Sequence, residues 1–549
     1  VKYMQQARVS YTPSYVMKAL VDHPVLSAAL VGLFHAKNDP SLKDSQRKID
    51  QWEAAIASGL ENVALLDQDR IIRFIKTLVD ATLRTNFYQR DTEGNPKSAV
   101  SFKMDSALVA YLPEPRPWRE IWVYSPRVEG IHLRGGRIAR GGIRWSDRAE
   151  DFRTEILGLM QAQMVKNSVI VPEGAKGGFI LKKLPENPPR DMYLNEGVEC
   201  YRIYVRAMLD ITDNRSGDKI IKPVDVFCHD DDDPYLVVAA DKGTAKFSDI
   251  ANGISLEYGF WLGDAFASGG SAGYDHKEVG ITARGAWECI KRHFRELGTD
   301  IQKEEFDVIG IGDMAGDVFG NGMLLSKKIR LIGAFNHQHI ICDPNPDVEK
   351  TWKERDRQFH AVKAWDDYDQ KLLSKGGKIF SRSDKSLTLT KEIRERFNID
   401  TDKIAPNDLI HAMLKAQCDL LYFGGIGTYV KASNQTHIDV GDRANDATRV
   451  DGNEVRAKVV GEGANLAVTR KARVEMSLKG VKLNADFIDN SGGVDCSDHE
   501  VNIKILLQEL TGGKKPEMTL PARNKLLENM TEEVANLVLR NNYQQSQAI

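Results

Sequence analysis

The sequence predicts an α/β protein in which a helical segment comes first and mixed helices and strands follow. Residues 1 to about 88 carry apolar side chains at helical spacing. Further along, an apolar strand runs into Gly310-x-Gly312-x-x-Ala315 and then a helix. Two later strands are also followed by glycine, at Gly424–Gly425 and at Gly463. Repeated units of a strand and then glycine indicate a parallel sheet that binds a ligand across the carboxyl ends of its strands.

The length and composition are those of an ordinary soluble protein. The 549 residues are enough for roughly two to four domains. Hydrophobic residues make up 42% of the chain and charged residues 28%. The 75 Lys and Arg residues against 78 Asp and Glu residues give a net charge of −3. Such a balanced charge indicates neither nucleic acid nor an anionic membrane as a partner.

The cysteines and the hydropathy indicate a cytoplasmic setting. Six cysteines are widely scattered and form no CxxC pair, so neither a disulfide framework nor a zinc site is predicted. No apolar run reaches the roughly 18 residues of a membrane span. No signal peptide opens the sequence.

The stretch from Arg140 to Gly178 carries the strongest chemical signal. Two glycine pairs, each beside a cation, flank a run with helical spacing of apolar residues from about 152 to 167. Gln163 and Lys166 are three residues apart and share one face of that helix. Lys176 follows in the second glycine turn. Hairpin turns with solvated lysines are the alternative for either pair alone, but two pairs around one helix favour a carboxylate site with a reactive amine.

An acidic residue is predicted to join this site from another strand. The strand that ends near residue 240 is followed by Asp241-Lys-Gly-Thr244, and the ends of strands in α/β sheets carry working residues. From the residues alone, Asp241 is equally well explained as the N-cap of the following helix. Just upstream, His229 and four consecutive Asp residues suggest a metal site, yet adjacent residues cannot all face one ion, so we expect loop chemistry and no metal.

The glycine motif at Gly310 predicts a dinucleotide site. The backbone amides after the strand would hold the pyrophosphate, and the following helix is expected to run to about Ile329. A second strand, residues 339–342, ends at Asp343, which is predicted to bind the ribose hydroxyls and to select NAD over NADP. Asp347 is the alternative. Asp313 should repel pyrophosphate unless its carboxylate is turned inward as an N-cap.

At these residues the chain resembles a known family. ArgGlyGlyIleArg at 140–144, GlnMetValLys at 163–166 and GlyAlaLysGlyGly at 174–178 resemble the substrate-domain signature of the glutamate, leucine, phenylalanine and valine dehydrogenases. ArgGlyGlyIleArgTrpSerAspArg and LysGlyThrAlaLysPheSerAspIleAlaAsn resemble the large multidomain bacterial NAD-specific glutamate dehydrogenases. The resemblance extends from about residue 10 to the end, and it implies that the chain is the catalytic region of a longer protein.

The resemblance implies a two-domain amino-acid dehydrogenase with four segments. We expect a helical segment at 1–95, a substrate domain with a mixed sheet at 96–290 and a Rossmann-like NAD domain at 291–497. Helices at 498–549 are expected to pack back on the substrate domain. The family implies an oxidoreductase of amino-acid catabolism that is a cytoplasmic homo-oligomer with a small-molecule substrate.

The resemblance also assigns roles to single residues. It implies catalytic roles for Lys176 and Asp241. The residues expected to bind substrate are Arg140, Gly141, Gln163, Lys166 and Ser497. The residues expected to bind NAD are Gly310, Gly312, Ala315, Asp343, Thr282, Gly425, Asn465 and Asn490. No metal is needed.

The implied reaction is the reversible oxidative deamination of L-glutamate by NAD. Gln163 and Lys166 would hold the α-carboxylate by charge-assisted hydrogen bonds. The pKa of Lys176 is expected to be lowered toward neutrality by nearby cations, so that the amine can activate water. Asp241 would move the proton at the amino nitrogen.

The preference for glutamate depends on the far end of the substrate pocket. Arg140 with Ser497 would bind the γ-carboxylate. Arg140 departs from the lysine usual in small glutamate dehydrogenases, and Arg144 or Arg137 are alternatives.

Two other functions stay open from the sequence. One is a dehydrogenase of another amino acid, such as leucine or phenylalanine. The other is a non-catalytic regulatory or scaffolding module that keeps the fold. The second predicts loss of the catalytic lysine or acid, and both are present. Residues 1–88 and 351–400 have no predicted role in chemistry.

Overall fold

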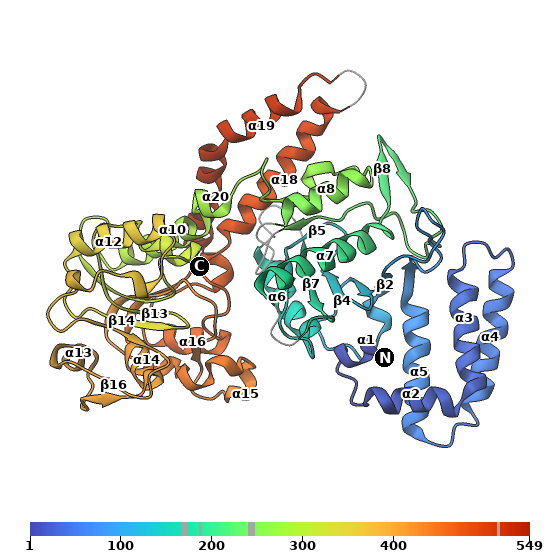
Figure 1. Ribbon diagram of the computed structural model, residues 1–549, viewed down its shortest axis with the longest axis horizontal. Helices are drawn as coiled ribbons and strands as arrows, with labels where there is room; N and C mark the ends of the chain where they lie inside the picture. The colour runs from blue at the N-terminus through green and yellow to red at the C-terminus, as the bar shows by residue number, and fades with distance from the viewer. Residues whose placement is uncertain (167–172, 186–188, 240–246, 513–515, 549) are drawn as a thin grey trace. The chain divides into compact units, whose positions relative to one another are not determined.

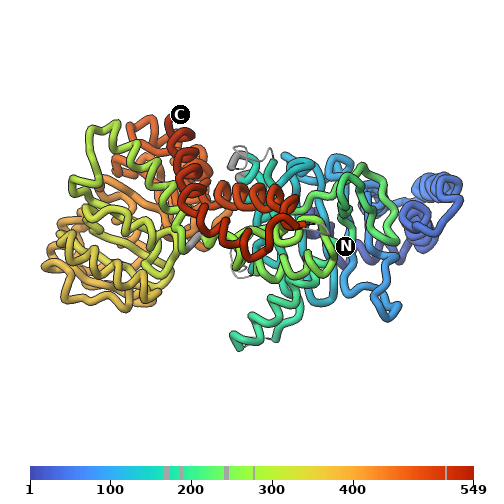
Figure 2. Tube along the Cα trace, turned by 90° about the horizontal axis from the view of Figure 1, so that it is seen from above, coloured from blue at the N-terminus to red at the C-terminus, as the bar shows by residue number. Residues whose placement is uncertain are grey.

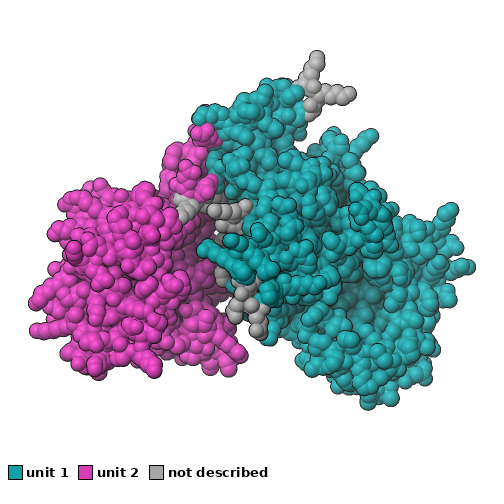
Figure 3. All heavy atoms as spheres, viewed as in Figure 1, with its two compact units in different colours: residues 1–274, 497–527 teal, residues 275–496, 528–549 magenta. Residues whose placement is uncertain are grey.

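The computed structural model divides the chain into two compact units. Unit 1 comprises Val1–Tyr274 and Ser497–Leu527, and unit 2 comprises Asp275–Cys496 and Glu528–Ile549 (Figure 3). The structure describes residues 1–166, 173–185, 189–239, 247–512 and 516–548, except for the side chains of Ala162, Val165, Lys166, His276 and Lys277. The helical segment at 1–95 therefore belongs to the same unit as the expected substrate domain, and the second unit begins earlier than the expected residue 291.

Unit 1 begins with helices packed through apolar faces. They are α1 (Lys2–Gln6), α2 (Pro13–Asp22), α3 (Pro24–Asn38), α4 (Ser45–Leu60) and α5 (Leu66–Ala81). Thr12 caps α2, whose first residue is proline, a favoured start. Leu33 on α3 and Ile56 on α4 are fully buried in one cluster, and the two helices lie side by side in both views (Figures 1 and 2).

No single helix in the described parts of the chain is long and apolar enough to cross a membrane. Only α2 and α3 taken together pass that test by length and composition, and they are bent by 99° at the break between them.

A mixed sheet forms the centre of unit 1. Its strands run in the order β1-β2-β3-β4-β7-β5, with β6 also paired to β7. Neighbours from β1 to β7 are antiparallel, whereas β5 and β6 are parallel to β7. The strands are β1 (Thr82–Thr85), β2 (Val100–Asp105), β3 (Arg119–Tyr124), β4 (Val128–Arg134), β5 (Ala139–Arg140), β6 (Ile143–Trp145) and β7 (Glu173–Leu181).

Two helices cover opposite faces of this sheet. Helix α6 (Phe152–Lys166) covers one face, where a Cβ on Gly178 would lie 2.3 Å from Ile156. Helix α7 (Arg190–Leu209) covers the other, where a Cβ on Gly177 would lie 2.9 Å from the hydroxyl of Tyr204. Alternate residues of β7 therefore face α6 and α7 in turn.

The rest of unit 1 surrounds this core. It includes η1 (Ser106–Leu108), β8 (Asn214–Ser216), β9 (Lys219–Ile221), β10 (Val238–Ala239), α8 (Ser248–Glu257), η3 (Gly263–Ala265), β11 (Ala267–Ser268) and α19 (Leu520–Asn529, whose last residues belong to unit 2). Helix α18 (Gly492–Thr511) enters unit 1 at Ser497.

The aspartates after His229 bind cations of the chain itself. Lys103 Nζ lies 2.5 Å from Asp230 and 2.7 Å from Asp233. Arg134 pairs with Asp233 at 2.6 Å. Arg84 is fully buried and pairs with Asp213 at 2.8 Å and with Asp230 at 2.5 Å. This network attaches the loop 230–233 to strands β1, β2 and β4.

A second sheet forms the centre of unit 2, in the order β15-β14-β13-β12-β18-β21. Strands β12, β13, β18 and β21 are parallel, and at one edge β14 runs antiparallel to both β13 and β15. The strands are β12 (Phe306–Ile311), β13 (Ile329–Phe335), β14 (His339–Cys342), β15 (Lys378–Ser381), β18 (Cys418–Phe423) and β21 (Ala457–Glu462). Together with the mixed sheet of unit 1, this Rossmann-like core confirms the predicted α/β class.

Helices and short elements complete unit 2. The helices are α9 (His276–Val279), α10 (Ile281–Glu296), α11 (Asp317–Gly322), α12 (Val348–Ala361), α13 (Lys391–Phe397), α14 (Pro406–Leu414), α15 (His437–Val440), α16 (Arg470–Leu478), α17 (Asp486–Asp489) and α20 (Thr531–Ala548). The short elements are η4 (Trp365–Asp367), η5 (Gln370–Leu372), β16 (Leu387–Thr388), β17 (Lys403–Ile404), β19 (Val430–Lys431), η6 (Arg443–Thr448), β20 (Val450–Asp451) and η7 (Gly452–Glu454).

The last helix differs from its expected position. We expected residues 498–549 to pack on the substrate domain as one group, but α20 belongs to unit 2 and packs on α10. Gly285 of α10 permits this contact, because a Cβ there would lie 2.5 Å from Asn542. The amide of Asn542 donates to the carbonyl of Ile488 at 2.9 Å. The C-terminal segment is therefore divided between the two units.

Candidate active site

Lys176 lies near the start of β7 and is only 5% exposed. It is paired in register with Leu133 of β4. Its neighbours at alternate positions, Gly174 and Gly178, both face α6. By the alternation of a strand, Lys176 faces α6 as well.

Gln163 is brought to the same face of the sheet. It lies in the last turn of α6, where a Cβ on Gly174 would come within 2.4 Å of the Gln163 backbone. Its side chain is 8% exposed, and its Oε1 has no hydrogen-bond donor among the described residues. The side chain of Lys166 and all of Asp241 lie outside the described residues, so both roles stay predictions.

Gly141 allows two segments of backbone to come very close. A Cβ at this position would lie 1.6 Å from the carbonyl oxygen of Ala175, the residue before Lys176. The amide of Gly177 donates to the carbonyl of Gly142 at 3.0 Å. The first glycine pair therefore fixes the backbone around Lys176, and any side chain at residue 141 would displace it.

Arg140 connects the site to α18. Its Nε donates to the hydroxyl of Tyr235 at 2.5 Å, and its terminal nitrogens donate to the carbonyl of Asp498 at 3.0 Å and to Oδ1 of Asn502 at 2.6 Å. Asp498 directly follows Ser497, which is 7% exposed. Arg140 therefore contacts the residue that follows Ser497, and all three of its guanidinium nitrogens donate to protein groups, so the γ-carboxylate role of Arg140 and Ser497 stays a prediction.

The two alternative arginines have other partners. Arg144 pairs with Glu155 at 2.9 Å, and Arg137 donates to the carbonyl of Asp232 at 3.0 Å. Neither contact connects its arginine to α18.

Sequence reasoning missed the residues that hold α18 in place. Glu500 is fully buried and accepts hydrogen bonds from the backbone amides of Gly269 and Tyr274. It also pairs with Lys504 at 2.8 Å. The sequence did carry a signal for this pair, because Glu500 and Lys504 have opposite charges and are four residues apart on a helix. That helix was expected only to pack on the substrate domain.

In unit 2, the turn after β12 has the geometry of a dinucleotide loop. Gly312 has φ +138°, in the range that favours glycine, and its amide donates to the carbonyl of Phe335 at 2.8 Å. Phe319 of α11 packs where side chains on Gly310, Gly312 and Gly424 would lie, at 2.5, 2.7 and 2.7 Å from their Cβ positions. These glycines therefore let α11 lie against the carboxyl ends of β12 and β18.

Asp313 is turned inward, as binding of an anion at this turn requires. Its Oδ1 accepts from the amide of Ala315 at 2.9 Å, and its Oδ2 accepts from the amide of Asn336 at 2.9 Å. The N-cap of α11 is Gly316 rather than Asp313. The expected helix to Ile329 is also wrong, because α11 ends at Gly322 and β13 begins at Ile329.

The predicted position of Asp343 at the ribose is wrong. Strand β14 runs antiparallel to β13, so it leads away from the dinucleotide turn, and the amide of Asp343 donates to the carbonyl of Ile332 in the middle of β13 at 2.9 Å. Asp343 is 2% exposed, and its carboxylate accepts from the backbone amide of Ser374 at 3.0 Å and from the Ser374 hydroxyl. Burial raises the pKa of Asp343. Asp347, the alternative, caps α12.

Of the remaining predicted cofactor residues, Gly425, Asn465 and Asn490 lie at or next to the carboxyl ends of the central strands. The amide of Gly424, next to Gly425, donates to the carbonyl of Ile311 at 2.9 Å, and the amide of Ala464, next to Asn465, donates to the carbonyl of Phe423 at 2.8 Å. Asn490 donates to the carbonyl of Glu462 at 3.0 Å, and its buried Oδ1 has no donor in the described part of the chain. Thr282 lies in the first turn of α10.

A buried cluster of acidic residues lies around the end of β21. Arg473 pairs with Glu462 at 2.8 Å and with Asp486 at 3.1 Å. Asp489 accepts the amide of Glu462 at 2.9 Å. Burial, which Arg473 opposes only in part, raises the pKa of Glu462 to about 8, and burial raises the pKa of Asp489 to about 6.

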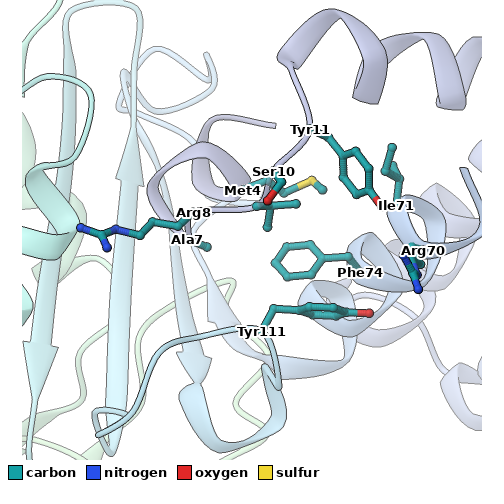
Figure 4. Close-up of a pocket in the computed structure, with 10 residues that line it drawn as sticks. Met4, Ala7, Arg8, Ser10, Tyr11, Arg70, Ile71, Phe74 and Tyr111 are labelled. Carbon is teal, nitrogen blue, oxygen red and sulfur yellow. The ribbon is translucent and has the colours of Figure 1, made fainter. Parts of the chain in front are cut away.

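A separate cavity of about 470 Å³ lies at the other end of α6 from Gln163. Its lining is mainly apolar and aromatic, with Tyr11, Phe74 and Tyr111 around it (Figure 4). Arg8 extends away from these rings, and its Nε donates to Thr154 in the first turn of α6 at 3.1 Å.

A parallel sheet with a glycine turn at the end of its central strand defines the class of α/β dinucleotide-binding proteins. The chain belongs to the family described as bacterial NAD-glutamate dehydrogenase, catalytic domain, whose model matches residues 55–549. Residues 1–40 match the helical motif 3 of glutamate dehydrogenase. The predicted family is thus confirmed.

Curated relatives agree with this family. The chain is 58% identical over 556 residues to an NAD-specific glutamate dehydrogenase of Pseudomonas aeruginosa, which it matches over 100% of its own length and 34% of the relative's. It is 55% identical over 549 residues to that of Halomonas elongata, again over 100% and 34%. The chain therefore spans about a third of the length of these relatives. A solved structure of Plasmodium falciparum glutamate dehydrogenase 2 aligns with TM-score 0.46 and 15% identity, over 95% of this chain and 90% of that one.

Proposed function

We propose that this chain is the catalytic region of an NAD-dependent glutamate dehydrogenase, which converts L-glutamate reversibly to 2-oxoglutarate and ammonia. The observation that carries the proposal is the buried amine of Lys176, on the same face of β7 as Gln163. A buried lysine on the sheet face that the helix of Gln163 covers suits chemistry at the α-carbon of an amino acid. The names of the relatives support NAD and glutamate as cofactor and substrate.

Residues of unit 1 would bind and activate the substrate. Gln163 and Lys166 bind the α-carboxylate. Once the α-carbon has lost hydride, water adds to the iminium carbon and its proton passes to Lys176. Asp241 takes a proton from the substrate's amino group before the hydride leaves and later returns it to the nitrogen. The C–N bond then breaks, ammonia leaves, and the hydroxyl loses its proton to solvent as it becomes the carbonyl of 2-oxoglutarate.

The far end of the substrate is assigned to Ser497 and Arg140. Arg140 donates to the carbonyl of Asp498 at 3.0 Å, next to Ser497 in the chain, and its charge is shared with the carboxylate of Asp498, which lies 3.5 Å away. A carboxylate would gain from this pair, whereas an aliphatic side chain would leave the two polar groups without a ligand partner.

Unit 2 has groups that fit NAD. The glycine turn at Gly312 follows the central strand β12 and precedes α11, with Ala315 and Gly425 beside it, which suits a pyrophosphate, while the amides of Gly312 and Ala315 already donate to Phe335 and Asp313. The buried Oδ1 of Asn490 would accept from an amide such as the nicotinamide carboxamide, near Asn465. When bound, NAD accepts the hydride.

The test is the rate of NADH formation by purified protein from L-glutamate, L-leucine, L-phenylalanine and L-valine. We expect L-glutamate to give the highest kcat/KM. A higher value for leucine would refute the assignment of Arg140 and Ser497. NAD binding without oxidation of any amino acid would favour a regulatory module.

Two further parts of the proposal rest on the family resemblance. We infer that the full-length protein acts as a homo-oligomer and that it works in the cytoplasm. Sedimentation of the full-length protein and fractionation of cells test these inferences.

A further inference from the structure

The edge of unit 2 where an adenosine ribose would bind lacks the expected acid. In dinucleotide folds, that acid stands at the end of the second parallel strand. Here the second parallel strand is β13, which ends at Phe335 and is followed by Asn336 and His337. Asp343 lies beside Ile332 in the middle of β13, away from the carboxyl edge, and Asp313 is bonded within the turn.

A segment from later in the chain reaches this edge. The indole of Trp365 donates to the carbonyl of Gly312 at 2.8 Å, and the ring is fully buried against Phe319, with centroids 5.7 Å apart. The helix η4 that contains Trp365 also packs on β14. The next residue, Asp366, is therefore fixed close to the dinucleotide turn.

A polar cavity of about 640 Å³ lies beside Asp366. Its walls are the β13–β14 turn at 337–339, the end of β15 at 381–383, and Asn407. His339 is paired in register with Ser381, so both wall segments lie at the same edge of the sheet as the carboxyl end of β13. This is the edge at which α/β sheets bind ligands.

Asp366 is the carboxylate that lines this cavity. It is exposed and has no hydrogen bond or ion pair among the described residues. Arg382, the nearby cation of the lining, donates from its guanidinium to the carbonyl of Asn336 at 2.8 Å, and its backbone amide donates to the carbonyl of Gln338. The carboxylate of Asp366 is therefore available to a ligand, whereas the guanidinium of Arg382 already donates to the β13–β14 turn.

We propose that Asp366 binds the adenosine ribose hydroxyls of NAD and excludes NADP. This rests on the proposed function of unit 2. A carboxylate accepts hydrogen bonds from both ribose hydroxyls, and it repels a 2′-phosphate. Residues 351–400, which had no predicted role, thus supply the selectivity that the end of β13 lacks.

The test compares binding of ADP-ribose and of 2′-phospho-ADP-ribose by calorimetry in wild-type protein and in Asp366→Asn. We expect the variant to bind ADP-ribose about tenfold more weakly, because a charged acceptor is lost. Binding of 2′-phospho-ADP-ribose should strengthen, and the ratio kcat/KM for NADP to that for NAD should rise in parallel.

Asp367→Asn is the matched control. Asp367 is the neighbouring carboxylate, but it pairs with Arg357 at 2.9 Å and does not line the cavity. Its variant should keep the wild-type preference. If Asp366→Asn leaves the ratio of the two affinities unchanged, or weakens both ligands equally, the proposal is overturned.

The same titration separates this proposal from the proposed function. Wild-type protein that prefers ADP-ribose through Asp366 but oxidises no amino acid would keep the ribose assignment and refute the dehydrogenase. Wild-type protein that prefers 2′-phospho-ADP-ribose would overturn the role of Asp366 and point to Arg382 as a phosphate ligand.

Discussion

The two units bury their charged groups in opposite ways. In unit 1, the carboxylates of Asp213, Asp230 and Asp233 meet the cations of Arg84, Lys103 and Arg134. In unit 2, Glu462 and Asp486 share the guanidinium of Arg473, with Asp489 close by. The first network balances its charges, whereas the second has more carboxylates than cations.

The ratio of cations to carboxylates in each network decides whether the pKa values of its carboxyl groups are lowered or raised. Burial alone would raise the pKa of Asp230 and Asp233, but the surrounding cations outweigh it, so both pKa values are lowered. In unit 2 burial outweighs Arg473, and the pKa of Glu462 rises to about 8. The partners of a buried carboxyl therefore decide whether a unit loses stability at low pH or at high pH. Surrounding cations cause the loss at low pH, and too few cations cause it at high pH.

The largest effect on stability is expected from Lys103→Met, which removes one cation from the balanced network. Breaking a buried ion pair costs about 3–5 kcal/mol of unfolding free energy. Denaturant unfolding followed by a probe in unit 1 measures it. Lys18→Met is the control, since Lys18 is 63% exposed and its pair with Asp22 is on the surface; it should leave the transition unchanged. If the two variants had the same unfolding free energy, the buried ion-pair network of unit 1 would not contribute to its stability.

Gly312→Ala should disturb unit 2 and leave unit 1 intact. A Cβ there would meet Phe319 at 2.7 Å, and the backbone φ of +138° disfavours alanine. The strain is about 1–3 kcal/mol, and binding of ADP-ribose should weaken. Gly441→Ala is the control in the same unit, with φ +74° and nothing within 4 Å of its Cβ. If the two variants bind ADP-ribose equally well, close packing at residue 312 is unimportant.

The pH dependence of local stability should have opposite signs in the two units. The lowered pKa values of Asp230 and Asp233 give unit 1 stability that is present above the ordinary value of 3.8 and is lost as pH falls below it. The raised pKa of Glu462 gives unit 2 stability that is present below 4.5 and is lost as pH rises to about 8. Hydrogen exchange of each unit across this range checks both signs. If the stability of the two units changed with pH in the same direction, the predicted difference between them would be wrong.

The smallest effect is expected from Glu462→Gln at neutral pH. The raised pKa of Glu462, about 8, favours the protonated carboxyl at neutral pH, and glutamine resembles that form. Unfolding free energy should change by less than about 1 kcal/mol, and the loss of stability of unit 2 with rising pH should become shallower. A large destabilisation at neutral pH would show that Glu462 is ionised in its pair with Arg473.

The positions of Lys176 and Gln163 in unit 1 were predictable from the sequence, because their signals are local. Helical spacing puts Gln163 near the end of α6, and the glycine pairs mark the close approach of backbone around Lys176. Alternation along β7 then places Lys176 on the face that α6 covers. The partners of Arg140 were not predictable, since Tyr235 and Asn502 are far from it in sequence.

The error at Asp343 has a physical cause in strand direction. The strand that pairs with β12 lies at 329–335, where a helix end was expected. Only residues 336–338 separate it from β14, and parallel neighbours need a crossover of a dozen or more residues. So short a connection permits only an antiparallel hairpin. Had β13 been recognised, the sequence would have excluded Asp343 from the carboxyl edge.

The assignment of chemistry to unit 1 and of cofactor to unit 2 is tested most directly by Lys176→Met. Turnover of glutamate should fall by about a hundredfold or more, while the affinity for NAD stays within about twofold of wild type. Lys182→Met, which changes a lysine just beyond β7 that donates to the carbonyl of Ser125, should leave both quantities unchanged. Full turnover in Lys176→Met would contradict the account.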